Sequence, residues 1–242
     1  MCKNAVQQGY KVTSLSRRGE CPLPDDPDLS QVTWTAGNAL DKSTIYSAVA
    51  ECDAVVHTIG LLFDANSGLT GLNTFTSASG SVPTEDSTYD NITRKAALLV
   101  IAALKARMTM PAVLGGEPIP MAFVSCAEAG WPDVPFGQQV EESAPDWLQR
   151  YLLAKRAVEA ELVSTDKIRA VIARPSLIWN WQKLDVLPVI PIFNIASALG
   201  VPFIDKTVRV ETIGKAIVAG LLDKSVSGVQ RYPEMEDLAS RI

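Results

Sequence analysis

Short apolar runs alternate along this chain with longer stretches in which apolar residues recur at helical spacing. Short runs rich in β-branched residues are typical of strands, and the longer pattern is typical of amphipathic helices. The strands predicted in this way cover residues 11–16, 32–35, 53–59, 121–125 and 168–173. The predicted helices cover residues 1–8, 43–50, 91–107, 147–163 and 211–222. Strands and helices that alternate at short spacing predict βαβ units and a mostly parallel sheet.

Turn-forming residues divide these elements. Gly9 follows the first helix as a helix-ending glycine, and Asp41 or Ser43 is expected to cap the second helix. Loops are predicted where Pro, Gly, Ser and Thr gather, and an apolar stretch interrupted by prolines is predicted to be irregular. The loops cover residues 21–31, 64–88 and 109–120, and the irregular stretch covers 183–210. An acidic tail closes the chain. We therefore expect one domain in which residues 1–180 form the larger part and 181–242 a smaller C-terminal segment.

Composition narrows the classes of function. The net charge of −5 gives no basic excess that would favour nucleic acid as a partner. Four scattered cysteines and a single histidine, His57, make a metal site improbable. No apolar run is long enough to predict a transmembrane helix. The proline-broken apolar stretch near residues 186–203 is better explained as core or substrate pocket than as a membrane contact.

The first candidate site is the pair Tyr151 and Lys155, which lie four residues apart in a predicted helix and so share one of its faces. A nearby ammonium lowers the pKa of a phenol and can hold a ribose hydroxyl, which suits acid/base catalysis of carbonyl reduction. A Tyr and a Lys at this spacing also occur by chance on amphipathic helices. The position of the helix favours the catalytic interpretation, since it follows a strand ending in Ser125 and precedes one ending in Arg174 and Pro175.

Other candidates follow the remaining strands, because parallel sheets bind ligands at the carboxyl ends of their strands. Ser16, Arg17 and Arg18 end the first strand, where arginine suits the 2′-phosphate of NADP, although a solvated basic turn explains them equally well. The turn from Thr58 through Ile59 to Gly60 would let the backbone approach a ligand closely. Asn91 at the start of the long helix could cap it or join a site network, and capping is the simpler explanation.

Several segments together resemble the short-chain dehydrogenase/reductase superfamily, in particular its atypical and extended branches. The segments that carry the resemblance are 11–19, 53–60, 121–130, 151–162 and 168–178, together with Asn91. The most specific is Tyr-Leu-Leu-Ala-Lys-Arg-Ala-Val-Glu-Ala-Glu-Leu, which begins at Tyr151. Within that branch, the chain is similar to mitochondrial NAD(P)-binding proteins associated with ubiquinone biosynthesis and to their plastid relatives. The accessory Rossmann subunit of respiratory complex I is a more distant match.

The resemblance implies an α/β fold with a doubly wound parallel sheet, in which 1–180 form an incomplete dinucleotide-binding domain and 181–242 its substrate-side segment. It also implies a set of site residues. Catalysis would fall to Tyr151, Lys155 and Ser125, and Asn38 would contact the adenine. The cofactor contacts implied are Ser16, Arg17, Arg18, Asn38, Thr58, Ile59, Gly60 and Pro175.

The sequence departs from the family pattern at two places. Ala127 stands where the catalytic serine is usual, two positions after Ser125, so the group that holds the substrate oxygen is in doubt. No glycine-rich phosphate loop lies upstream of Tyr10, although the family opens with a strand and such a loop. We therefore expect the chain to be N-terminally truncated, to lack the central strand of the sheet, and to bind cofactor poorly as written.

Two functions are consistent with these features. The first is an NADP-dependent (or NAD-dependent) oxidoreductase that acts on a lipophilic substrate such as a quinone or an isoprenoid. The second is a non-catalytic nucleotide-binding scaffold or assembly factor of an organellar complex. The resemblance implies a mitochondrial location, with plastid and cytoplasm as the alternatives.

Overall fold

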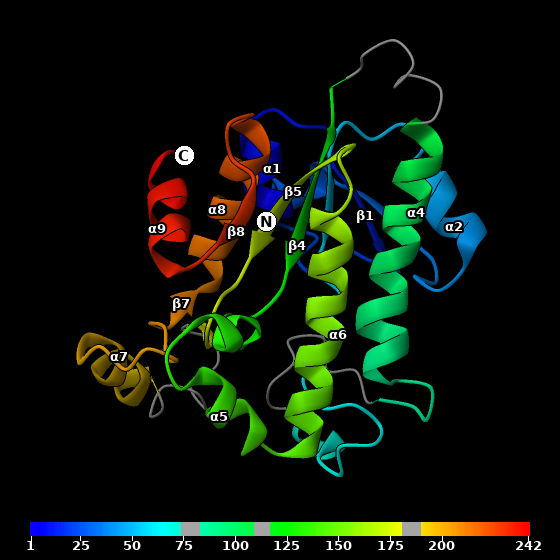
Figure 1. Ribbon diagram of the computed structural model, residues 1–242. Helices are drawn as coiled ribbons and strands as arrows, with labels where there is room; N and C mark the ends of the chain where they lie inside the picture. Colours follow the sequence, from blue (N-terminus) through cyan, green and yellow to red (C-terminus); the bar gives the residue numbers. More distant parts are fainter. Residues whose placement is uncertain (74–82, 109–116, 181–189) are drawn as a thin grey trace.

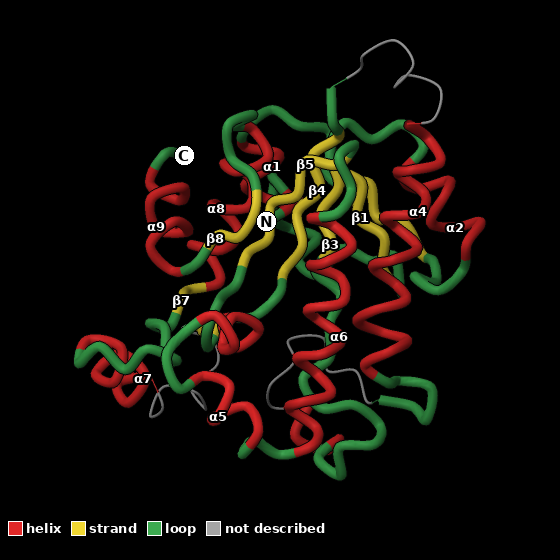
Figure 2. Tube along the Cα trace, in the orientation of Figure 1, coloured by secondary structure: helices red, strands yellow, loops and turns green. Residues whose placement is uncertain are grey.

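A parallel sheet flanked by helices on both faces forms the centre of the molecule (Figures 1 and 2). The computed structural model describes residues 1–73, 83–108, 117–180 and 190–242. The main sheet has the order β3–β4–β5–β8, with every neighbouring pair parallel. Its strands are β3 (Val55–His57), β4 (Ile119–Val124), β5 (Ile168–Ala173) and β8 (Gly228–Gln230).

A second parallel pair consists of β1 (Thr13–Ser16) and β2 (Thr33–Ala36). Within the described part of the chain, no ladder of hydrogen bonds joins β1 to β3. Leu15 and Val55 nevertheless pack against the same apolar cluster, and both remain only partly buried. The expected central position between these two strands is therefore not filled by any described strand.

Alternating side chains of β4 and β5 build one core on each face of the sheet. Met121 and Phe123 join a cluster with helices α2 (Lys42–Val49), α4 (Ala96–Met108) and α6 (Asp146–Val163). Ala122 and Val171 face the opposite cluster, which includes α8 (Val210–Leu222) and α9 (Tyr232–Ser240). Helix α1 (Cys2–Gln7) lies on this second face, against α8. The two-sided burial explains why these strands read as continuous apolar runs in the sequence.

Most of the predicted elements are confirmed, several to within one or two residues. Gly9 has a positive φ of 82° after α1, and the Asp41 side chain caps α2 by accepting from the Thr44 amide at 2.9 Å. The long helix, however, begins with a π-helical segment, Tyr89–Lys95, that runs into α4. Thr88 caps it, so capping by Asn91 is wrong.

One expectation for the C-terminal part is also wrong. The stretch 183–210 is not irregular throughout, because it contains helix α7 (Ile190–Ala198) and the short strand β7 (Val208–Arg209). The acidic tail contains two elements that were not predicted, since β8 completes the main sheet and α9 packs on it. Strand β7 pairs with β6 (Ile178–Trp179) in a separate two-stranded sheet. Parts of the 64–88 and 109–120 loops, and residues 181–189, lie outside the described residues.

Candidate functional site

Helix α6 places Tyr151 and Lys155 beside the carboxyl end of β4. The Lys155 side chain is 3% exposed, and its Nζ donates to the Val124 carbonyl at 2.7 Å. The same ammonium lies 5.0 Å from the ring centre of Phe123 and 5.6 Å from that of Tyr151. Lys155 therefore bridges the helix that carries Tyr151 to the strand that leads into Ser125.

The pKa values in this site differ from the expectation. Burial lowers the pKa of Lys155 to about 8, partly offset by Cys126 and Glu159. Burial also holds the pKa of Tyr151 well above its usual range, and the nearby Cys126 and Glu128 act in the same direction. The idea that the ammonium gives this phenol a low pKa is wrong for this structure. Tyr151 is protonated at neutral pH, which makes it a proton donor.

Two buried polar side chains at the ends of adjacent strands have no hydrogen-bond partner among the described residues. They are Ser125, at 4% exposure, and His57, whose two ring nitrogens are both unpartnered. Burial, followed by the positive charge of Lys155, lowers the pKa of His57 to about 4. Buried polar groups are almost always hydrogen-bonded, so unmet ones need an explanation, such as a group that binds there. His57 pairs in register with Phe123, so both side chains lie at one end of the sheet.

The turn after β3 meets the same helix. Thr58, Ile59 and Gly60 are exposed, and a Cβ placed on Gly60 would come within 3.3 Å of the Lys155 ammonium. A larger residue at this position would require the Lys155 ammonium to shift by a few tenths of an ångström. On the other side of β4, Pro175 is buried, and its carbonyl accepts a hydrogen bond from the Ala127 amide at 2.8 Å. The turns after β3, β4 and β5 therefore gather around α6.

The turn after β1 is built for close approach to β2. Gly19 has φ +64°, and a Cβ there would lie 2.3 Å from the Ala36 nitrogen. The Ser16 hydroxyl oxygen accepts from the Gly19 amide at 3.0 Å, so this side chain shapes the turn. Arg17 and Arg18 are exposed, and neither guanidinium has a hydrogen bond or ion pair within the described ranges.

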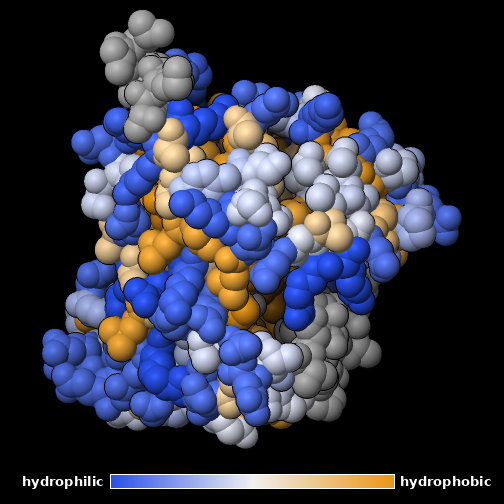
Figure 3. All heavy atoms as spheres, turned by 90° about the vertical axis from the view of Figure 1, so that its right-hand side faces the viewer, coloured by the Kyte–Doolittle hydropathy of each residue, from blue (hydrophilic) through white to orange (hydrophobic). Residues whose placement is uncertain are grey.

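Asn38 follows β2 by two residues and leads into α2. Its side-chain oxygen accepts from the Leu40 amide at 2.9 Å, which fixes the turn before the Asp41 cap. A cavity of about 490 Å³ opens next to Leu40 and is lined also by Asp86, Asn91, Lys95, Leu98 and Leu99. Figure 3 shows the face that carries α2 and α4, where hydrophobic atoms are visible between polar ones and inside a hollow.

A bidentate ion pair joins β5 to α6. The Arg174 guanidinium donates to both oxygens of Glu159, at 3.1 and 2.5 Å, and both side chains are largely buried. Glu159 lies one helical turn beyond Lys155, so this pair fixes the helix against the strand whose end carries Pro175.

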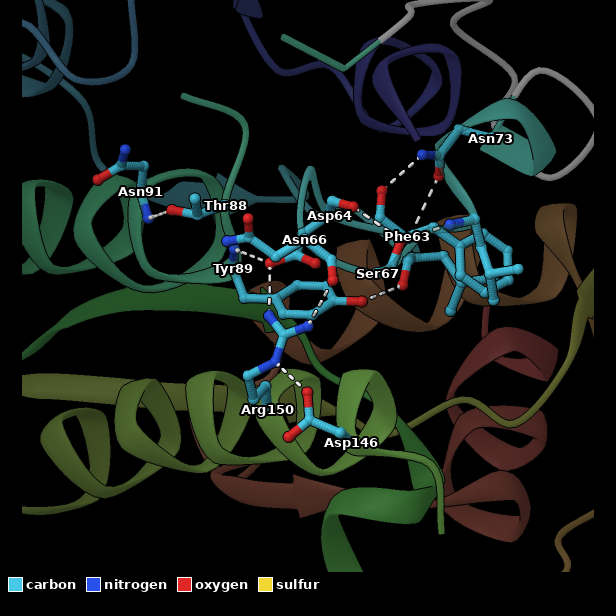
Figure 4. A network of polar contacts seen from close by, with 12 residues as sticks. Phe63, Asp64, Asn66, Ser67, Asn73, Thr88, Tyr89, Asn91, Asp146 and Arg150 are labelled. Carbon is cyan, nitrogen blue, oxygen red and sulfur yellow. Dashed lines mark hydrogen bonds and ion pairs between the residues drawn. The ribbon is translucent and has the colours of Figure 1, made fainter. Parts of the chain in front are cut away.

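A polar network around Asp64 and Arg150 was not predicted from the sequence (Figure 4). Arg150 directly precedes Tyr151 in α6. Asp64 and Arg150 form an ion pair at 2.8 Å, and Tyr89 packs its ring against that of Tyr151 at 5.6 Å. Asp64 and Arg150 are 86 residues apart, so no local pattern could have linked them. Within the residues described, no group of His, Cys, Asp or Glu is arranged to hold a metal ion. Nor does any helix in these residues have the length and apolarity needed to cross a membrane.

Solved structures with a similar fold include proteins in complex with NAD+. A Bacillus halodurans protein described as an NAD-dependent epimerase/dehydratase superposes with a TM-score of 0.58 at 15% identity, over 100% of this chain and 92% of its own. The Bordetella bronchiseptica enzyme WbmH in complex with NAD+ superposes with a TM-score of 0.56 at 17% identity, over 94% of this chain and 68% of its own. This chain has the Rossmann fold of the NAD-dependent epimerases and dehydratases. The predicted Rossmann-type fold is therefore confirmed, and with it the resemblance to short-chain dehydrogenase/reductases at the level of fold.

A sequence relative adds a different kind of similarity. The chain is 25% identical over 210 residues to the Saccharomyces cerevisiae protein named MIOREX complex component 2, covering 78% of this chain and 71% of that protein. No model of a protein family matches the sequence. The chain thus resembles NAD-binding enzymes in fold, and in sequence a protein that is named as a component of a complex.

Proposed function

We propose that this Rossmann protein binds a nicotinamide dinucleotide across the carboxyl ends of its strands and reduces a carbonyl group. The observation that carries the proposal is the position of Tyr151 and Lys155. Both lie on one face of α6, beside the strand ends where Ser125 and His57 are buried without partners. In such sheets this edge is the usual ligand site.

The residues present fit the two ends of the cofactor. The glycine-rich loop that would hold its pyrophosphate is absent from residues 1–10, so we expect weak binding. Gly60 leaves room for a group next to Lys155, and the unpaired Arg17 and Arg18 suit a 2′-phosphate, which favours NADP. The cavity beside Leu40 is large enough for an adenine, and Asn38 lies two residues away. Thr58, Ile59 and Pro175 would contact the nicotinamide end. When bound, the reduced dinucleotide would supply hydride.

The chain's own residues would handle the proton. Tyr151, protonated because burial raises its pKa, would donate a proton to the carbonyl oxygen. Lys155 uses one N–H on the Val124 carbonyl, so its other donors are available for a ribose hydroxyl. The Ser125 hydroxyl would hold the substrate oxygen, in place of a hydroxyl at position 127. These roles need no metal ion.

The substrate side is proposed to lie in residues 181–242, with 1–180 as the nucleotide-binding part. Helix α7 has no buried residue, and Ile192 and Ile195 are 66% and 60% exposed. Such apolar surface favours a lipophilic carbonyl compound, for example a quinone or an isoprenoid.

A second function is favoured by the yeast relative and by Ala127. A sequence relative that is named as a component of a complex supports a role as a nucleotide-binding scaffold within an organellar assembly. The missing hydroxyl at position 127 would then reflect a site that binds without turning over. A mitochondrial location, proposed for both functions, rests mainly on the resemblance to ubiquinone-associated proteins.

Binding and turnover separate the two functions. We expect NADPH to bind this chain more tightly than NADH in a fluorescence titration, and Arg17→Ala with Arg18→Ala to remove that preference. Lys11→Ala with Lys167→Ala is the matched control, because it removes the same charge from exposed positions away from the site. With a quinone substrate, Tyr151→Phe should abolish NADPH oxidation. Saturable binding without turnover would favour the scaffold, and no saturable binding of either dinucleotide would overturn both.

A further inference from the structure

A buried carboxylate lies beside the candidate site without belonging to it. Asp64 is 1% exposed and follows β3 by seven residues. Its Oδ2 accepts from Arg150 Nη1 at 2.8 Å and from the Tyr89 amide at 3.4 Å. Its Oδ1 has no partner among the described residues. A buried carboxylate is costly unless it is paired, and Arg150 supplies the opposite charge.

Arg150 connects this carboxylate to helix α6. Its Nε donates to Asp146 one turn earlier at 2.7 Å, and its Nη2 donates to the Asn66 carbonyl at 3.3 Å. The guanidinium also lies 5.4 Å from the centre of the Tyr89 ring. Arg150 thus contacts both the segment after β3 and the ring that faces its neighbour in sequence, Tyr151.

Tyr89 is fixed at each of its polar ends. It is 3% exposed, and its hydroxyl donates to the Leu62 carbonyl at 2.7 Å. Its ring meets that of Tyr151 edge to face, with the ring planes at 64°. The Tyr89 amide donates to Asp64 and its ring faces Arg150 (Figure 4). Together with the bond from its hydroxyl to Leu62, these contacts fix the orientation of the Tyr89 ring against Tyr151.

The segment that carries Asp64 is itself held in place. The Asn73 side chain donates to the Phe63 carbonyl at 2.6 Å and accepts from the Phe63 amide at 3.2 Å. The Phe63 ring packs on Trp147 at 4.9 Å. Trp147, Arg150 and Tyr151 are spaced to share one face of α6. The segment contacts this face at Trp147 and at Arg150.

From this geometry we infer that Asp64 and Arg150 are positioning residues that act through the Tyr89 ring to fix the Tyr151 phenol. The inference rests on the proposed role of Tyr151 as proton donor. The segment after β3 would then hold Tyr151 in position, a role that is separate from cofactor binding. A positioned catalytic group matters for rate, since a misplacement of about 1 Å can cost roughly 100-fold in turnover.

The first measurement is made without substrate. The chain has five tyrosines, so labelling each at its two Cε atoms, which a ring flip exchanges, gives a ¹³C spectrum in which Tyr→Phe variants assign every signal. In Arg150→Leu and in Tyr89→Leu, we expect the Tyr151 signal to move and its ring to flip roughly tenfold faster or more. Arg150→Lys should restore part of the wild-type signal, because it keeps a charge for Asp64.

A matched control lies on the same helix. Arg156 pairs with Glu141 at 2.9 Å and is buried to a similar degree, but its partner is in α5 (Gly137–Glu142) and not in the segment after β3. Arg156→Leu should lower the melting temperature without moving the Tyr151 signal. If Arg156→Leu and Arg150→Leu change that signal equally, the network only stabilises the helix and the inference is wrong.

The second measurement uses turnover with NADPH and a quinone. We expect Tyr89→Leu and Arg150→Leu to lower kcat roughly 10- to 100-fold while KM changes less than about threefold. Should the wild-type chain show no turnover while the Tyr151 signal still responds, the proposed reaction fails and the positioning stands. If the wild-type chain turns over but Arg150→Leu leaves the Tyr151 signal unchanged, the proposed reaction stands and the positioning role is wrong. Variants that do not fold are replaced by Tyr89→Phe, which keeps the ring and loses only the bond to Leu62. Its Tyr151 signal should move by a smaller but measurable amount, and an unchanged signal would overturn the positioning.

Discussion

The ion pair between Arg174 and Glu159 allows a quantitative prediction. In Arg174→Met the Glu159 carboxylate keeps its buried position but loses both of its donors, since the two side chains are 13% and 7% exposed. Removing one partner of a buried pair typically costs about 3–5 kcal/mol, because the other charge is left uncompensated. For a domain of this size, each 1 kcal/mol shifts the melting temperature by roughly 2–4 °C. We therefore expect a drop of roughly 6–20 °C.

Urea unfolding followed by circular dichroism would measure this loss. The double variant Arg174→Met with Glu159→Leu should recover most of the stability, because it removes both charges and leaves apolar groups of similar size. The control pair, Lys224 and Glu117, is 76% and 73% exposed, and its loss should cost less than about 1 kcal/mol. The reasoning is refuted if Arg174→Met costs no more than this exposed control, or if the double variant is less stable than Arg174→Met.

Two further predictions concern the strand ends. His57 has a pKa near 4 in the folded state and 6.5 in the unfolded state, so the unfolded chain binds more protons between these values. Stability should fall by roughly 3 kcal/mol as the pH drops from about 6.5 to 4, and His57→Phe should flatten this part of a urea-unfolding profile taken against pH. Gly19→Ala should lower the melting temperature by several degrees, because its φ is +64° and a Cβ would come within 2.3 Å of the Ala36 nitrogen. An unchanged melting temperature would show that this turn relaxes freely.

The sequence predicted most of the fold because its signals are local. Strand β5 and helix α6 have strong apolar periodicity, and the Asp41 cap and Gly9 mark helix ends by their chemistry. Strand β8 was missed because three residues carry no readable period, and it forms only by pairing with β5. Helix α7 was missed because the prolines in and around it indicated a loop. Pro191 lies in the first turn of the helix, where proline is tolerated.

The candidate site was predictable only in part. The spacing of Tyr151 and Lys155 predicts a shared helix face, and strand ends predict which turns gather around it. The pKa of Tyr151 was misjudged because it depends on burial and on Cys126, which follow from packing rather than from spacing. Tyr89 and Asp64 were missed for a similar reason, since their contacts with α6 join segments that are far apart in the chain.

The most direct test of the central claim is to map where NADPH binds. Amide resonances of the ¹⁵N-labelled chain would be followed during a titration with NADPH. The account predicts saturable shifts at the carboxyl ends of the strands, in residues 16–19, 38–40, 58–60 and 125–127, and at Lys155. Shifts confined to the opposite edge of the sheet, or none that saturate, would contradict it.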